Sequence, residues 1–96
     1  MRIEWLHKAL DSLDEEAAWI AADNPEAARI VVQRIVSAVN LLPGNPALGR
    51  PGRIDGTREL VVPDTPYLAP YRVRPRLKRI EILRIFHTAR RPPTHW

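Results

Sequence analysis

Cysteine is absent from this sequence, and its absence excludes several kinds of chemistry at once. No disulfide can form, and neither a thiolate nucleophile nor a thiolate metal site can exist. Long apolar runs are missing as well. No stretch approaches the roughly 18 residues that a membrane span requires, and the N-terminus lacks the apolar segment of a signal peptide. We therefore expect a cytoplasmic protein that makes no contact with a membrane.

Lysine is scarce, with 2 residues against 13 arginines, and the charges are unevenly distributed. Residues 1–49 carry four basic and seven acidic side chains, whereas residues 50–96 carry eleven basic and four acidic ones. The first half is therefore net −3 and the second half net +7, which agrees with the total of +4. This asymmetry predicts a basic face for an anionic partner, either nucleic acid or an acidic protein segment. A solvated surface without a partner is the alternative.

The N-terminal half of the chain predicts a strand followed by two helices. A length of 96 residues suits a single domain, residues 1–96. Residues 1–5 alternate as a short strand does, and apolar residues then recur every three or four positions up to Ala21. The acidic side chains of this first helix, Glu16 among them, are expected to point away from its apolar stripe. Asn24 and Pro25 are typical of a helix start, and the second helix ends at "LLPG".

The C-terminal half predicts a loop followed by three strands. All four glycines lie between residues 44 and 56, but no Walker or dinucleotide-binding spacing is present, so a phosphate-cradling loop is not supported. Residues 57–62, 67–74 and 79–86 read as strands with short connections, which indicates an antiparallel meander. Together the elements predict an α+β domain with a helical hairpin packed on one sheet face. The other face is expected to be open or covered by a partner.

Strand periodicity indicates where the arginines lie. Arg72 and Arg74 fall on the same side of their strand, opposite Tyr71, and we interpret Tyr67 and Tyr71 as core residues. In the last strand Arg84 shares one side with Ile80, Ile82 and Phe86, while Glu81, Leu83, Ile85 and His87 share the other.

The basic groups of the last strands and of the tail are then expected to meet. If Arg72 and Arg84 project from the open face, Arg90 and Arg91 in the tail can join them in one concave basic patch. The structural alternative pairs Arg84 with Glu59 or Glu81.

Several segments resemble the RelE/ParE superfamily of bacterial toxins. They are "NPEAARIVVQRIVSAVNLLPGNPALGRPG", "TRELVV", "YLAPYRV" and "IEILRIFHTARR", in the order of the family and over nearly the whole chain. The resemblance implies a β-α-α-β-β-β fold with a mostly antiparallel sheet and the toxin of a type II toxin–antitoxin operon. The partner that it implies is a cognate antitoxin with an acidic, disordered C-terminal segment that folds on the toxin. Neither a cofactor nor a metal is expected.

One branch of this superfamily cleaves messenger RNA on the ribosome. By motif, its strand and tail arginines correspond to Arg72 and Arg90. His87 and His95 are the candidate proton-transfer groups, and a structural or interfacial role is the alternative for His87. The tail tyrosine of that branch appears as Trp96, and "TRELVV" offers Arg58 where lysines are expected. Since an arginine is always protonated and an indole does not exchange protons near neutral pH, the catalytic set is incomplete.

The other branch inhibits DNA gyrase, and the long helices and the "NPEAAR" junction favour it. The resemblance then leads us to expect target contacts from Arg84, Arg91, His95 and Trp96, the tail being held extended by Pro92 and Pro93. Cleavage of ribosome-bound mRNA is the alternative, and a non-toxic basic nucleic-acid-binding module is a more distant one. For the antitoxin we expect contacts at Arg58, Arg72, Arg74 and Arg84.

Overall fold

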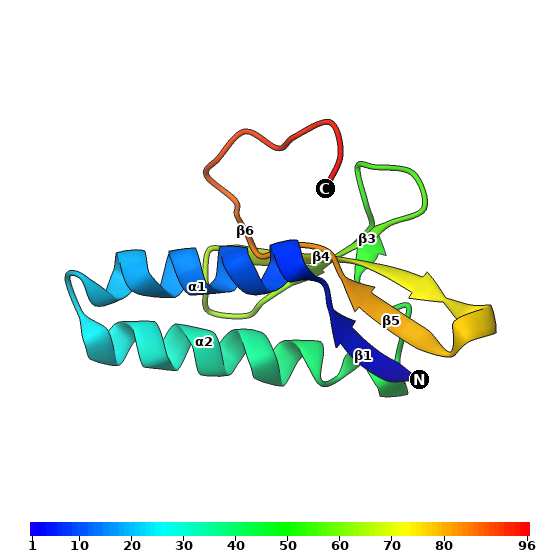
Figure 1. The fold of residues 1–96 in the computed structure, drawn as a ribbon, viewed down its shortest axis with the longest axis horizontal. Helices are drawn as coiled ribbons and strands as arrows, with labels where there is room; N and C mark the ends of the chain where they lie inside the picture. The colour runs from blue at the N-terminus through cyan, green and yellow to red at the C-terminus, as the bar shows by residue number, and fades with distance from the viewer.

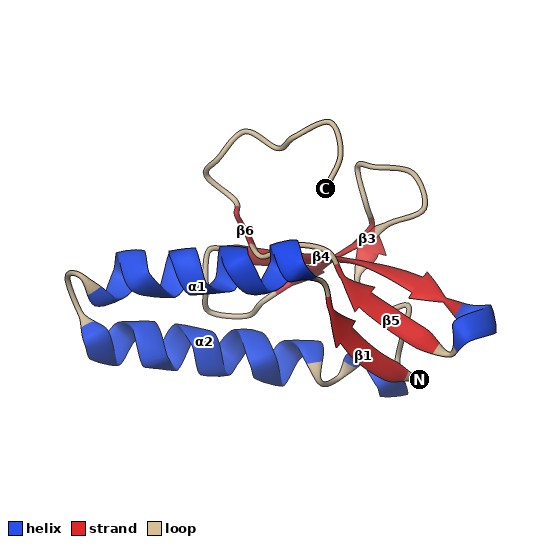
Figure 2. Cartoon of the chain, in the orientation of Figure 1, coloured by secondary structure: helices blue, strands red, loops and turns tan.

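The computed structural model describes residues 1–96 and has two long helices beside one sheet (Figures 1 and 2). In chain order the elements are β1 (Arg2–Trp5), α1 (His7–Ala21), α2 (Pro25–Val39), η1 (Leu42–Gly44), β2 (Arg50–Pro51), β3 (Arg58–Val61), β4 (Tyr67–Arg74), η2 (Pro75–Leu77), β5 (Arg79–Ile82) and β6 (Phe86–His87). The strand, the helical pair and the later strands expected from the sequence are therefore confirmed. The short strand β2 lies within the segment that was expected to be entirely loop.

The helical hairpin forms for the local reasons that the sequence indicates. The side chain of Asn24 caps α2 by accepting a hydrogen bond from the backbone N–H of Ala27 at 3.1 Å. Pro25 occupies the first turn, where its missing N–H costs nothing, and Glu26 lies at the positive end of the helix dipole. Figure 1 shows the two helices running antiparallel, with the hairpin tip far from β1 and β5.

The sheet has the order β1-β5-β4-β3-β2, with β6 paired to β4. Strands β3, β4 and β5 form the expected antiparallel meander, while β1 adds parallel to β5 on its outer side. Strand β5 is consequently interior, and its residues Ile80, Glu81 and Ile82 are buried, as the two apolar faces of this segment predicted.

The last predicted strand, residues 79–86, is broken in the structure. Tyr71 of β4 faces Ile82, and Leu68 of β4 faces Phe86. Between these two pairs, the segment that joins β5 to β6 therefore has one residue more than β4. This extra residue is a local bulge that shifts the alternation of side chains. Phe86 therefore turns to the face of Leu68, whereas Ile85 joins the main core. The expected division of Ile85 and Phe86 between the faces is wrong for this reason.

The main core lies between the helices and one face of the sheet. Tyr67 and Tyr71 of β4 are buried there, as predicted, with Ile35 of α2 and Ile80 and Ile82 of β5. Each such side chain contributes about 1.5–3 kcal/mol when fully removed from water. Because side chains alternate along β4, the opposite face of the sheet is left to the even-numbered residues from Leu68 to Arg74.

Candidate functional site

The sheet face opposite the helices carries both charged and apolar side chains. By register, Arg72 and Arg74 of β4 share this face with Arg79 and Glu81 of β5. Leu68, Pro70, Leu83 and Phe86 are also buried on it, under the loop after β2 and the C-terminal tail. The expected open concave patch of arginines is therefore only partly present.

Most cations of this face are paired with carboxylates. Glu81 accepts hydrogen bonds from Arg74 Nε at 3.2 Å and from Arg79 Nη2 at 2.7 Å, and Arg79 also lies 3.2 Å from Glu4. Burial alone would raise the pKa of Glu81, but the bonds from Arg74 and then Arg79 lower this pKa below its ordinary value. Both oxygens of Glu81 are thus occupied, and Arg72, its register partner, has no carboxylate bound to it.

A second buried carboxylate fixes the loop after β2. Glu59 Oε2 accepts hydrogen bonds from the backbone N–H of Arg53 at 3.1 Å and from its Nε at 3.0 Å, while Arg50 Nη2 lies 3.3 Å from Oε1. Burial opposes ionisation of Glu59, yet these arginine bonds lower its pKa overall. Glu59 and Glu81 have other partners, so the alternative in which either residue forms an ion pair with Arg84 is not found. Arg84 is half-buried, and its Nε has no hydrogen-bond partner.

Arg58 does not lie with Arg72 and Arg74. It faces Tyr71 across the β3–β4 pair and therefore projects on the helix side of the sheet. Its Nη1 donates to the carbonyl oxygen of Gly49 at 2.7 Å, which holds the loop against β3. The register of β3 therefore places Arg58 on the other sheet face from Arg72 and Arg74, so the structure does not bring the predicted antitoxin contacts together on one face.

Arg90 and His87 also lie on the helix side. Arg90 Nη1 and Nη2 donate to the two carboxylate oxygens of Glu16 in α1 at 2.6 and 3.2 Å. His87 packs edge-on against Tyr67 with ring centroids 5.2 Å apart, and its Nδ1 accepts the backbone N–H of Ala89. The three nuclease candidates Arg72, His87 and Arg90 are thus divided between the two faces of the sheet.

Glu16 does not point away from the apolar stripe of α1, so its expected position is wrong. Its side chain is buried rather than solvent-exposed, and it accepts a hydrogen bond from the Tyr67 hydroxyl at 3.0 Å in addition to the two from Arg90. A signal was present in the sequence, since Ala9, Ser12 and Glu16 fall on one helical face at three- and four-residue spacing. A buried carboxylate requires such partners, and the tail supplies one of them.

The remaining tail residues are spread along its length. Arg91 and His95 are exposed, whereas Trp96 is half-buried and packs edge-on against Phe86 with ring centroids 5.2 Å apart. The indole Nε1 of Trp96 is shielded from solvent and has no acceptor in the protein. Figure 1 shows the tail running back toward the loop between β2 and β3.

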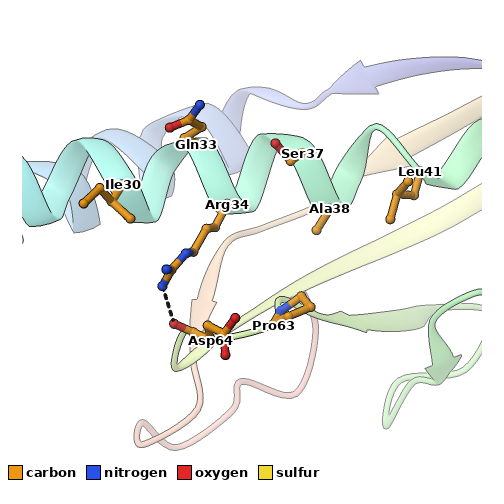
Figure 3. Close-up of a pocket in the computed structure, with 8 residues that line it drawn as sticks. All are labelled: Ile30, Gln33, Arg34, Ser37, Ala38, Leu41, Pro63 and Asp64. Atoms are coloured by element: carbon orange, nitrogen blue, oxygen red, sulfur yellow. Dashed lines mark hydrogen bonds between the residues drawn. The ribbon is translucent and has the colours of Figure 1, made fainter.

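A groove of about 600 Å³ runs along α2 on another side of the molecule (Figure 3). Ile30 and Leu41 are exposed in it, and Arg34 Nη1 reaches across it to donate to the backbone carbonyl of Asp64 at 3.1 Å. A neighbouring cleft shares Leu41 and continues to the exposed side chains of Leu48 and Val61. Such a run of exposed apolar residues is typical of a protein-binding surface.

No helix of the protein has both the length and the apolar character needed to cross a membrane. No group of three or more histidine, aspartate or glutamate side chains is arranged to hold a metal ion.

The fold and the sequence match known toxins. A family model described as the ParE toxin of the type II toxin–antitoxin system parDE matches residues 3–92. The candidate toxin Y4kP of Sinorhizobium fredii (strain NBRC 101917 / NGR234) is 49% identical over 92 residues, which are 96% of this chain and 93% of Y4kP. A chain in the solved structure of a chromosomal ParDE toxin–antitoxin system from P. aeruginosa is 37% identical, with a TM-score of 0.78. The match covers 91% of this chain and 95% of that one. The chain therefore belongs to the ParE toxin family of type II toxin–antitoxin systems.

Proposed function

We propose that this protein arrests growth by inhibiting DNA gyrase and that a cognate antitoxin neutralises it. The observation that carries the choice of target is the separation of Arg72 from His87 and Arg90 by the thickness of the sheet. Cleavage of RNA needs a proton acceptor and phosphate-binding cations around one phosphodiester. Side chains on opposite faces of a sheet do not meet at one phosphate.

The environments of the two tail-side candidates support the same proposal. Arg90 already neutralises the buried Glu16, and withdrawing it would leave an unpaired carboxylate inside the protein. His87 is held by its ring contact with Tyr67 and by the backbone of Ala89. Both residues therefore have structural roles that compete with a role in catalysis.

For the contact with gyrase we propose the exposed tail residues Arg91 and His95, together with Trp96. Pro92 and Pro93 restrict the backbone between these residues, so less conformational entropy is lost when they bind. Arg84 has a supporting role in this proposal, since its side chain is half-buried and offers less surface to a target than the exposed tail residues do.

Two measurements test the proposed target. Purified protein is added to gyrase and relaxed plasmid, and the yield of supercoiled DNA is measured. In parallel, the protein is induced in cells, and the 5′ ends of ribosome-bound transcripts are mapped. We expect inhibited supercoiling and intact transcripts. Arg91→Ala/His95→Ala should require roughly tenfold more protein for the same inhibition, whereas Arg76→Ala, at an exposed site in η2, should behave like the wild type.

Transcript cleavage with normal supercoiling would overturn the proposal. If that cleavage disappeared in Arg72→Ala, the RNA-cleaving alternative would replace it.

For the antitoxin we propose two contact areas. The exposed apolar side chains of Leu41, Leu48 and Val61 suit the apolar side of a segment that folds on binding. The half-buried Arg72 and the exposed Arg74 suit its acidic side chains. Support comes from the P. aeruginosa relative, which was solved as a toxin–antitoxin system.

The antitoxin surface is tested with the protein encoded by the adjacent gene. Leu41 and Leu77 are exposed by 62% and 55%, so Leu41→Ser and Leu77→Ser form a matched pair at two different sites. We expect Leu41→Ser to weaken binding about tenfold or more and Leu77→Ser to leave it unchanged. The affinity should also fall as salt rises, because charge contacts are screened. Equal affinities for both variants would refute the proposed groove.

A further inference from the structure

A cleft of about 380 Å³ lies where four parts of the chain meet, and one of them is the loop after β2, which contributes Ile54. The first turn of α1 contributes His7 and Lys8, the sheet contributes Arg72 and Leu83, and the tail contributes His95 and Trp96. This volume is within the range of roughly 300–1,000 Å³ that is usual for small-molecule sites. The cleft is separate from the apolar groove along α2, with which it shares no residue.

None of the side chains that line this cleft is a carboxylate. The groove along α2, its neighbour and the cleft at the hairpin tip each contain one, from Asp64, Glu59 and Asp23 respectively. Arg72 and Lys8 make no salt bridge, and Glu81, which faces Arg72 across the strands, has both oxygens bound by other arginines. The nearest acid on α1 is the exposed Asp11, whose Oδ2 lies 3.9 Å from His7 Nε2. The cleft therefore favours an anion.

The start of α1 strengthens the preference of the cleft for an anion, but this preference does not depend on it. Leu6 at the N-cap makes no side-chain hydrogen bond to the first turn, and that turn contains no acidic residue. The positive end of this 15-residue helix is consequently not neutralised by the protein.

The same cleft also has an apolar and aromatic side. Trp96 and Leu83 line it, and the Trp96 Nε1 donor is buried without an acceptor. This nitrogen is shielded from solvent, so a ligand in the cleft would contact the apolar ring of Trp96. The ligand that suits these groups has an anionic end and a planar ring.

We propose that this cleft binds a nucleoside monophosphate, with the phosphate at Arg72 and Lys8 and the base beside Trp96 and His95. Arginine and lysine are the usual partners of phosphate, and every nucleobase offers an apolar ring face and ring acceptors. An acidic peptide would satisfy the cations but would leave the aromatic side without a ring. The ligand is either a free nucleotide or the phosphorylated end of an oligonucleotide, and both have this chemistry. The proposal does not depend on gyrase as the target.

The site is tested on the purified full-length protein with adenosine and uridine 5′-monophosphates. The three tryptophan indole N–H signals are followed by nuclear magnetic resonance, and Trp96→Phe assigns the signal of Trp96. We expect the Trp96 signal to move on titration, with Trp5 and Trp19 unchanged. Arg72→Gln and Lys8→Gln should each weaken binding about tenfold. Arg76→Gln removes the same charge from an exposed site outside the cleft and should have no effect.

Comparison of ligands tests the phosphate and the nucleoside separately. Nucleosides should bind at least tenfold more weakly than the monophosphates, and so should inorganic phosphate. A 5′-phosphorylated oligonucleotide that binds better than the mononucleotide would identify a nucleic-acid end as the source of the phosphate.

Three results would overturn the inference. They are an unmoved Trp96 signal, an Arg76→Gln variant as weak as Arg72→Gln, and nucleosides that bind as tightly as the monophosphates. Far-ultraviolet circular dichroism checks that each variant is folded. Trp96→Phe provides a second test, because it keeps a ring but removes the donor, and it should weaken binding less than Arg72→Gln does. Gyrase is absent from all these measurements, so their outcome is independent of the supercoiling assay.

Discussion

Arg90 binds Glu16 through both of its terminal nitrogens, at 2.6 and 3.2 Å, although the two residues are 74 positions apart in the sequence. This contact ties the start of the C-terminal tail to the middle of α1. The Glu16 carboxylate is buried, while the Arg90 side chain is 54% exposed. Breaking the pair would therefore leave Glu16 as an unpaired buried charge, whereas Arg90 would still be solvated.

The first prediction concerns this pair. Arg90→Ala should lower the free energy of unfolding by about 2 kcal/mol, below the roughly 3–5 kcal/mol of fully buried pairs because the guanidinium is partly solvated. Glu16→Gln with Arg90→Ala should cost less than the sum of the single changes, because the buried charge is then removed. Urea denaturation of the wild type, the two single variants and the double variant measures this coupling. Strictly additive losses of unfolding free energy would show that the pair makes no net contribution to stability.

The second prediction concerns alkaline pH. Burial, and then the hydrogen bond to Glu16 and its charge, raise the pKa of Tyr67 from 10.0 to about 12. The unfolded chain therefore loses this proton more readily than the folded protein. The stabilisation is fully present below pH 10 and is lost as the pH rises toward about 12. Tyr67→Phe should show a smaller loss of thermal stability over this interval, and tyrosinate absorbance should show one fewer late-titrating group.

The third prediction concerns acid. Glu59 and Glu81 have a pKa below the ordinary 4.5 in the folded protein because of their arginine partners. Their contribution to stability is therefore present above about pH 4.5 and is lost as the pH falls through the lowered pKa values. Glu59→Gln and Glu81→Gln should be less stable than the wild type at neutral pH, but they should lose less stability than the wild type on acidification. Denaturation midpoints between neutral and acidic pH measure the two slopes, and parallel slopes would exclude a role for these carboxyls.

The fourth prediction compares two glycines of the loop after α2. A Cβ at Gly49 would lie 2.6 Å from Cε1 of Tyr71, whose hydroxyl accepts the Gly49 N–H at 2.8 Å and donates to the Pro46 carbonyl at 2.7 Å. A Cβ at Gly44 would meet nothing within 4 Å. Gly49→Ala should therefore cost about 1–3 kcal/mol through overpacking, whereas Gly44→Ala should change little. Thermal unfolding of both variants decides the matter, and equal melting temperatures would contradict the close packing.

The local elements could be predicted from the sequence because their causes are local. Asn24 and Pro25 start α2 through groups within one turn, and the two-residue alternation of β4 places Tyr67 and Tyr71 in the core. The resemblance of the motifs to known toxins also gave the family, which the comparisons confirm. These features need only the order of residues along a short segment.

The distribution of charges between the two sheet faces depended on the tertiary structure. Arg58 lies on the other sheet face from Arg72 because of the register of β3 with β4. The bulge before β6 exchanges the sheet faces of Ile85 and Phe86. Neither the register nor the bulge is encoded by the periodicity of one strand, since both arise from pairing between strands.

The sequence by itself thus determined the helices, the antiparallel meander, the tyrosine core and the net +7 of the second half. Only the tertiary structure decided which of those cations are neutralised. Glu16 is buried because Tyr67 and Arg90 arrive from distant segments, and Arg72 is left unpaired because Arg74 and Arg79 occupy Glu81. The physical reason is that a charged side chain is buried or left free according to its neighbours in space, and those neighbours come from segments far apart in the chain.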